Sequence, residues 1–129
     1  MKAAFLLDTD ILIDVLRKNI QAESFLKKHI GTVFVSVISL TELYAGVRGP
    51  REIKSVEALL MSIEGVYDVT AQIAQRAGEY RNRYGKSHNT GVVDAIIAAT
   101  AEVHEMRLVS LNKKHFPMCS SLLVPYKKS

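Results

Sequence analysis

Three acidic residues stand out because each lies beside an apolar run, where a strand or a helix is expected to begin or end. Asp8 follows the apolar segment 3–7. Glu42 comes after a Val-rich segment, and Asp94 begins an Ala-rich stretch. An ionised carboxylate that leaves water needs a partner, and neither Asp8 nor Asp94 has Lys or Arg as an immediate sequence neighbour. If folding brings the three acids together, they require a shared divalent cation or shared protons.

The size and composition of the chain are those of a globular domain, and we expect a single domain over residues 1–129. A chain of 129 residues can bury a core without disulfides. The one cysteine, Cys119, excludes an internal disulfide and favours a reducing compartment, so we expect the cytoplasm. No apolar run approaches the roughly 18 residues of a membrane span. The net charge of +4 favours a nucleic-acid partner only slightly.

Short apolar runs alternate with segments of helical periodicity, which predicts an α/β layered fold with a mainly parallel sheet. We expect strands at 3–7, 33–37, 66–69, 107–110 and 122–124. We expect helices at 11–17, 21–29 and 39–47, from Pro50 to Gly65, from Thr70 as the cap to Gly85, and at 90–105.

On this outline the three acids share one edge of the sheet. Asp8 lies at the carboxyl end of the first strand, and Glu42 lies in the helix after the second. Asp94 lies in the first turn of the helix that leads to the fourth strand, and segment 110–112 follows that strand. Ligands of open α/β sheets collect beyond the carboxyl ends of the strands. The sequence therefore predicts one site at this rim.

Each acid also has a structural alternative. Ser39 and Glu42 have the spacing of a capping box. Asp94 can interact with its helix dipole, and Asp8 can cap the helix that follows it. These effects stabilise by about 1 kcal/mol or less, whereas two unit charges about 4 Å apart repel by about 4 kcal/mol near a protein surface. A shared cation is therefore favoured, and oxygen ligands select Mg²⁺ or Mn²⁺ over zinc.

Four segments resemble, in order, the signatures of the PIN domain, and they are most similar to those of VapC-type toxin ribonucleases. They are segments 7–13, 39–43, 94–101 and 108–116. The resemblance implies a Rossmann-like three-layer α/β/α sandwich with a mainly parallel central sheet. It also implies a Mg²⁺- or Mn²⁺-dependent endoribonuclease that hydrolyses RNA phosphodiester bonds with a metal-activated water. The implied partners are RNA, an antitoxin protein and a second copy of the chain.

The resemblance also assigns residues by position. Asp8, Glu42 and Asp94 match the metal-binding catalytic acids of the family. Ser110 matches the Ser or Thr that supports the site, and we assign a second supporting role to Thr9.

Two departures from the family pattern concern the metal. Family members often have Asp where this chain has Asn112, or an acid where it has His115, and commonly have Asn where it has Asp10. Asn112 can bind an ion through its carbonyl oxygen but adds no charge. Asp10 either joins the acid cluster or caps the first helix, so Asp10 and Asn112 are further candidate metal ligands. Asp14 is expected to face solvent or a basic neighbour.

Several basic residues near the predicted rim are candidates for contacts with the RNA backbone, although each can equally be an ordinary solvated charge. These candidates are Arg48, Lys86, Lys113, Lys114 and His115. Arg76, Arg81 and Arg83 are expected on the exposed side of their helix, where they can meet RNA, an acidic partner or water.

Two rival functions remain open at this point. In a phosphatase of the haloacid-dehalogenase type, Asp8 would be the nucleophile and Asp10 the acid/base. That motif departs here at Leu12 and lacks its later pair of acids. In a degenerate PIN domain, weakened by Asn112, the chain would bind RNA or a protein partner without cleavage.

Overall fold

The computed structural model describes residues 3–127 and contains a four-stranded parallel sheet. The strand order is β3-β2-β1-β4, and each neighbouring pair is parallel. The strands are β1 (Phe5–Leu7), β2 (Val33–Ser36), β3 (Gly65–Tyr67) and β4 (Arg107–Val109). The predicted parallel sheet is confirmed.

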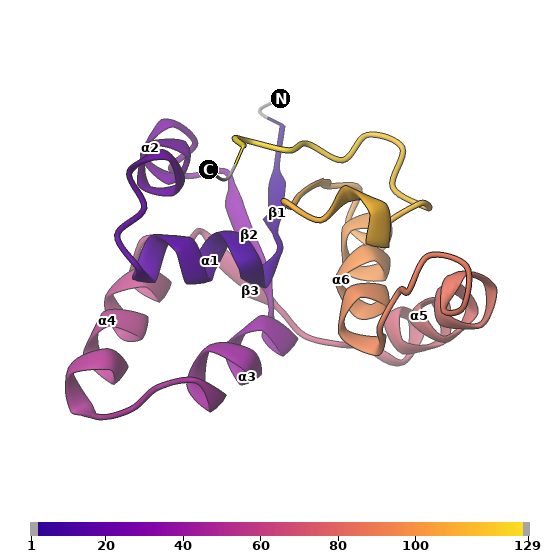
Figure 1. Ribbon diagram of the computed structural model, residues 1–129, viewed down its shortest axis with the longest axis horizontal. Helices are drawn as coiled ribbons and strands as arrows, with labels where there is room; N and C mark the ends of the chain where they lie inside the picture. The colour runs from indigo at the N-terminus through magenta and orange to yellow at the C-terminus, as the bar shows by residue number, and fades with distance from the viewer. Residues whose placement is uncertain (1–2, 128–129) are drawn as a thin grey trace.

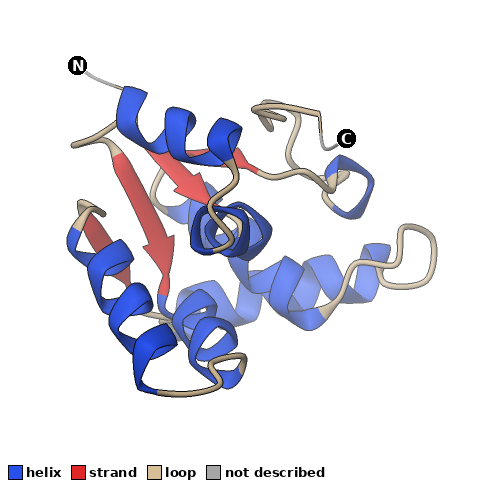
Figure 2. Cartoon of the chain, turned by 60° about the vertical axis from the view of Figure 1, so that its left-hand side comes forward, coloured by secondary structure: helices blue, strands red, loops and turns tan. Residues whose placement is uncertain are grey.

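Helices cover both faces of this sheet (Figures 1 and 2). The helices are α1 (Thr9–Leu16), α2 (Ile20–Lys28), α3 (Val37–Ala45), α4 (Pro50–Met61), α5 (Ala71–Tyr84) and α6 (Val92–Val103), followed by a short 3-10 helix, η1 (Lys113–His115). Helices α1 to α4 lie on one side, and α5 and α6 lie on the other (Figure 1). The predicted three-layer α/β/α sandwich is therefore confirmed.

The alternation of side chains along the strands builds a core on each face. In β1, Phe5 and Leu7 pack into the core beneath α1 to α4, whereas Leu6 packs into the core beneath α5 and α6. Successive side chains of a strand point to opposite faces, and a parallel sheet is buried on both. This explains why the apolar run in β1 is continuous.

The observed ends of several elements follow from local hydrogen bonds. Thr70 caps α5, as predicted, because its Oγ1 accepts from the backbone N–H of Ile73 at 3.2 Å. Pro50 begins α4, as predicted. Its lack of an N–H costs no hydrogen bond there, because the first N–H groups of a helix have no acceptor within the helix.

Two predicted features are wrong. The cap of α3 is Ser36, whose Oγ accepts from the N–H of Ile38 at 3.2 Å, so the helix starts before Ser39 and the capping box does not form. The predicted strand 122–124 is reduced to a single parallel bridge between Leu123 and Val109. Pro125 lies two residues further on and has no N–H to extend that ladder.

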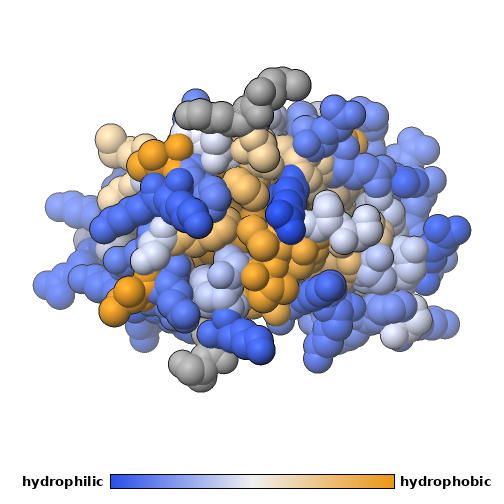
Figure 3. Space-filling view, turned by 90° about the horizontal axis from the view of Figure 1, so that it is seen from above, coloured by the Kyte–Doolittle hydropathy of each residue, from blue (hydrophilic) through white to orange (hydrophobic). Residues whose placement is uncertain are grey.

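The surface carries scattered apolar side chains among many hydrophilic ones. Figure 3 shows one such face, where apolar surface gathers mainly in the middle and hydrophilic side chains surround it. Ile20 and Met61 are the most exposed large apolar residues in the described part of the chain. None of the helices within residues 3–127 has the length and apolar character to cross a membrane.

Candidate active site

The predicted rim contains a cavity of about 390 Å³ lined from α1, α3, the start of α6 and the segment after β4. The cavity is lined by Asp8, Thr9, Asp10, Ile13, Glu42, Gly91, Val92, Val93, Asp94 and Asn112. Four acidic side chains from α3, α6 and the β1–α1 junction therefore face one space. The parallel topology explains this, because the carboxyl ends of β1 and β2 lie at the same edge of the sheet.

Asp8 is the most enclosed of these acids. It is 5% exposed. Its Oδ1 accepts from the backbone N–H of Thr9 at 2.8 Å, and its Oδ2 accepts from Ser110 Oγ at 2.6 Å. Burial, followed by the charge of Asp10, raises the pKa of Asp8 from 3.8 to about 7. The folded chain thus places an acid where a negative charge is unfavourable without a cation.

Asp10 is bonded to the segment that follows β4. Its Oδ2 accepts from the backbone N–H of Leu111 at 3.0 Å and from Asn112 Nδ2 at 3.2 Å. Its Oδ1 is buried and has no hydrogen-bond partner among residues 3–127. Burial raises the pKa of Asp10 above its usual value, and the charge of Asp14 adds to that rise. The cap of α1 is Asp8 rather than Asp10.

Glu42 and Asp94 are more open to solvent. Glu42 is exposed on α3. The Asp94 side chain is 25% exposed, and its Oδ2 accepts from the backbone N–H of Gly91 at 3.2 Å. His115 Nδ1 lies 3.6 Å from the same oxygen. Asp94 therefore has a nearby imidazole, from a residue that the sequence placed near the rim without indicating this contact.

Two hydroxyl contacts around the cavity are not readable from the sequence. Thr9 Oγ1 lies 2.8 Å from Ser39 Oγ, and this buried contact joins the starts of α1 and α3. Thr90 Oγ1 donates to the carbonyl oxygen of His115 at 2.8 Å, which ties the start of α6 to η1. Thr9 therefore lies next to Asp8 and contacts Ser39, and the Ser39 hydroxyl does not act as a helix cap.

The donor chemistry of the cavity fits a hydrated Mg²⁺ or Mn²⁺ ion. All its acidic and amide side chains offer oxygen, which these ions prefer. Within residues 3–127, no Lys or Arg forms an ion pair with Asp8, Asp10, Glu42 or Asp94.

The described side chains include no group of three or more His, Cys, Asp or Glu already close enough to hold an ion together. This still fits Mg²⁺, which keeps several waters and is often held by one or two carboxylates plus substrate phosphate.

The candidate RNA-contacting residues lie in separate parts of the structure. Lys113, Lys114 and His115 form η1, directly after Asn112. Arg48 pairs with Glu52 at 3.3 Å and lines a neighbouring cavity that also includes Glu42. No Lys or Arg of the described chain lines the acid cavity itself.

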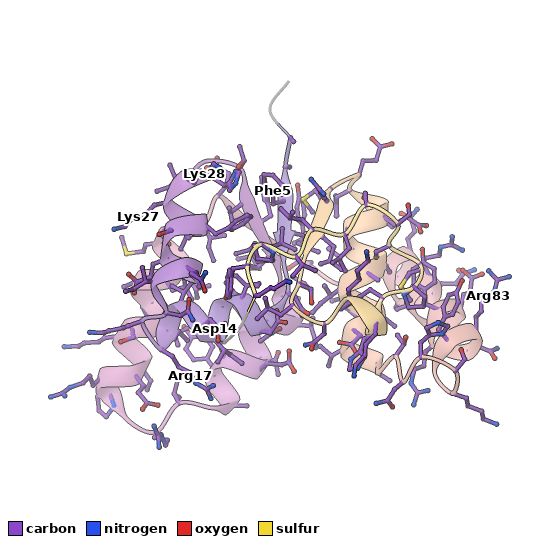
Figure 4. The ribbon with its side chains drawn as sticks, turned by 45° about the horizontal axis from the view of Figure 1, so that its top comes forward. Phe5, Asp14, Arg17, Lys27, Lys28 and Arg83 are labelled. Carbon is purple, nitrogen blue, oxygen red and sulfur yellow. The ribbon has the colours of Figure 1, made fainter. Side chains whose placement is uncertain are left out.

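Lys86 and the three arginines of α5 discussed above lie outside the cavity. Lys86 is exposed in the segment between α5 and α6. Arg81 and Arg83 are exposed on α5 as predicted, and Figure 4 shows Arg83 on the opposite side of the molecule from Asp14 of α1. Arg76 Nε forms an ion pair with Glu102 Oε1 at 2.7 Å. No basic residue of α5 therefore lines the cavity.

The expectation that Asp14 faces solvent is wrong. Asp14 is 2% exposed and its Oδ2 accepts from the Tyr126 hydroxyl at 2.7 Å. The C-terminal segment crosses the buried side of α1 at this point, which a local reading of the helix could not reveal.

Comparisons with known proteins identify the family of this fold. A family model described as PIN domain matches residues 5–117. Ribonuclease VapC10 of Mycobacterium tuberculosis is 41% identical over 124 residues, which cover 94% of this chain and 92% of that protein. Ribonuclease VapC19 of the same organism is 37% identical, covering 94% and 98%. A toxin-antitoxin complex from Klebsiella pneumoniae contains a chain with a TM-score of 0.83 and 26% identity, covering 97% and 100%. The chain belongs to the PIN domain family.

Proposed function

We propose that this protein is a divalent-metal-dependent endoribonuclease and the toxin of a toxin–antitoxin pair. The observation that carries the proposal is that Asp8, Glu42 and Asp94, from three separate elements, line one cavity. The names of the relatives, ribonucleases VapC10 and VapC19, support the activity. The Klebsiella pneumoniae toxin-antitoxin complex supports a protein antitoxin as partner. Membership of the PIN family argues against the phosphatase interpretation of Asp8 and Asp10.

Asp8, Glu42 and Asp94 would hold Mg²⁺ or Mn²⁺ in this cavity. When bound, such an ion activates water and stabilises the charge that develops on a phosphoryl group. Ser110 and Thr9 fix the Asp8 carboxylate through its two oxygens. Because this carboxylate is held in place before substrate arrives, little reorganisation is needed during the reaction.

Residues around the cavity would bind the RNA backbone. Lys113 and Lys114 follow the cavity residue Asn112 and are exposed, so they can contact phosphates beside the bond to be cut. His115 lies against Asp94 and can donate to a phosphate oxygen. Phosphate contacts of this kind weaken as salt is raised.

The proposal predicts that purified protein cuts a pool of structured RNA with Mg²⁺ or Mn²⁺ and not in EDTA. Asp8→Asn, Glu42→Gln and Asp94→Asn each lower the cleavage rate by at least about 100-fold, because such an ion contributes several kcal/mol to the transition state. Sequencing of RNA 5′ ends measures the cuts. Asp68→Asn, on an exposed loop, is the matched control and cuts normally.

Cutting that persists in EDTA would contradict the metal dependence, and normal cutting by all three variants would contradict the residue assignments.

One feature favours a second candidate, an RNA-binding PIN domain without activity. Asn112 lines the cavity where family members often carry an acid. That function requires the wild-type protein to retain RNA intact while Mn²⁺ titration shows no binding.

The proposal extends to oligomeric state and compartment. We infer a homodimer in the cytoplasm, in line with the family resemblance. Analytical ultracentrifugation of the purified chain tests the dimer, and co-purification with the product of an adjacent gene tests the antitoxin.

A further inference from the structure

We propose that Asp10 is a positioning residue that holds the segment after β4 against α1, and thereby keeps Ser110 hydrogen-bonded to Asp8. The segment, residues 110–112, is called the 110–112 loop below. The inference deepens the proposed function and rests on it, since the cavity that the loop borders is the same one. It assigns Asp10 a role different from that of a metal ligand.

The contacts of Asp10 are concentrated on this loop. Its Oδ2 accepts from the N–H of Leu111 at 3.0 Å and from Asn112 Nδ2 at 3.2 Å. The first of these spans 101 positions of the sequence. Hydrogen bonds to an ionised carboxylate are roughly twice as strong as neutral ones. One side chain of α1 therefore fixes both the backbone and a side chain of the loop.

Ser110 connects the loop to Asp8. Its Oγ lies 2.6 Å from Asp8 Oδ2 and 3.5 Å from Asp10 Oδ2. A hydroxyl has one proton, and the shorter distance assigns it to Asp8. The same Oγ accepts from the N–H of Asn112 at 3.0 Å. A loop held at positions 111 and 112 thus delivers the Ser110 hydroxyl to Asp8 in a fixed orientation.

The beginning of the loop has a separate anchor. The N–H of Ser110 donates to the carbonyl oxygen of Leu123 at 3.1 Å, next to the bridge between Leu123 and Val109. The N–H of Asp8 donates to the carbonyl oxygen of Val109 at 2.9 Å. These backbone bonds do not involve Asp10. They should survive when Asp10 is replaced, and they provide an internal control.

The two oxygens of Asp10 differ. Oδ2 already accepts from Leu111 and Asn112 and is committed to the loop, whereas Oδ1 is buried and has no hydrogen-bond partner among residues 3–127. An amide oxygen at this position can accept the same two hydrogen bonds without burying a charge. The proposal therefore requires an acceptor at position 10, whereas a metal ligand requires the negative charge.

Two substitutions separate these requirements. Asp10→Ala removes the acceptor of the Leu111 N–H, so this amide proton exchanges with solvent at least about 10-fold faster, measured by NMR. The amides of Asp8 and Ser110 keep their protection. Cleavage of the pooled RNA falls about 10- to 100-fold in kcat, with KM within about 3-fold. Asp10→Asn restores amide protection and recovers at least about a third of the wild-type rate.

Asn112→Leu is a second test that does not depend on Asp10→Ala folding, because Asn112 is exposed. It removes one of the two donors, and amide exchange at Leu111 accelerates by about 3-fold or more. Asp68→Ala, an exposed acid outside the site, leaves exchange and cleavage as in the wild type.

The inference is overturned if Asp10→Asn loses as much activity and Mn²⁺ affinity as Asp10→Ala, because the charge is then what matters. Unchanged exchange at Leu111 in either Asp10→Ala or Asn112→Leu overturns it as well. Asp8→Asn in the same assay separates the two hypotheses. If Asp8→Asn cuts normally, the assignment of Asp8 in the proposed function is wrong, whereas failure of the Asp10 predictions alone leaves that assignment standing.

Discussion

The two sides of the acid cavity are built in opposite ways. On one side, which we call the bonded wall (Asp8, Thr9, Asp10, Ser110 and Asn112), Asp8 is 5% exposed and both its oxygens accept hydrogen bonds. The other side, the open wall, consists of Glu42 and Asp94. Glu42 is exposed, and its carboxylate has no hydrogen bond from any residue in the 3–127 range.

This difference assigns different physical tasks to the two walls. The bonded wall is fixed before ligand binds, but it places a carboxylate where ionisation is unfavourable. The open wall costs little to fold and can adapt to an ion or to RNA. Functional sites commonly lower stability in this way. The destabilisation should therefore arise from the bonded wall alone.

The largest predicted effect is a pH dependence of stability that comes from Asp8. Its pKa is raised from 3.8 to about 7, so between these values the folded state binds a proton that the unfolded state has lost. The free energy of unfolding therefore falls as pH rises from about 4 to about 7, by up to about 4 kcal/mol. Urea unfolding of metal-free protein at pH 5 and pH 8 captures the part of this change above pH 5, about 2.6 kcal/mol.

Asp8→Asn is the control for that prediction, because it removes the titrating group and keeps the shape. The variant should lose most of the difference between pH 5 and pH 8. If wild type and Asp8→Asn change equally with pH, the cost of burial does not lie in Asp8.

Much of the fold could be predicted from local sequence. The continuous apolar runs of β1 and β2 predict strands buried on both faces, and Thr70 and Pro50 mark helix starts by side-chain and ring chemistry that acts within a few residues. The errors at Ser39 and at 122–124 have a tertiary cause. The Ser39 hydroxyl contacts the Thr9 hydroxyl of another helix, and Leu123 forms its bridge with Val109 of the edge strand β4.

The candidate site also has features that the sequence predicts and features that depend on long-range contacts. Residue types and parallel topology were sufficient to bring Asp8, Glu42 and Asp94 to one rim. The partners of these acids were not readable, because they come from distant positions. Ser110 is 102 positions from Asp8, and Asp14 accepts a hydrogen bond from Tyr126, 112 positions away. Such long-range contacts decide whether an acid accepts hydrogen bonds or remains exposed to solvent.

A smaller effect is expected from Ser110→Ala, which removes one hydrogen bond from the bonded wall. At pH 8, where Asp8 is mainly ionised, the variant should lose about 1–3 kcal/mol of stability because a buried carboxylate oxygen loses its donor. At pH 5 Asp8 is protonated and the loss should be smaller. Ser120→Ala, at an exposed position, is the matched control. An equal loss at both pH values would mean that the Ser110 hydroxyl does not act on the Asp8 charge.

The smallest effect on stability is expected at the open wall, from Glu42→Gln. Because Glu42 is exposed, its substitution should change the free energy of unfolding by no more than about 0.5 kcal/mol at either pH. The same variant should nevertheless lose RNA cleavage, since the proposed ion requires its charge. Urea unfolding and 5′-end sequencing on one preparation test both statements together. A stability change as large as that of Asp8→Asn would show that Glu42 is not on an open wall, and the contrast between the two sides would then fail.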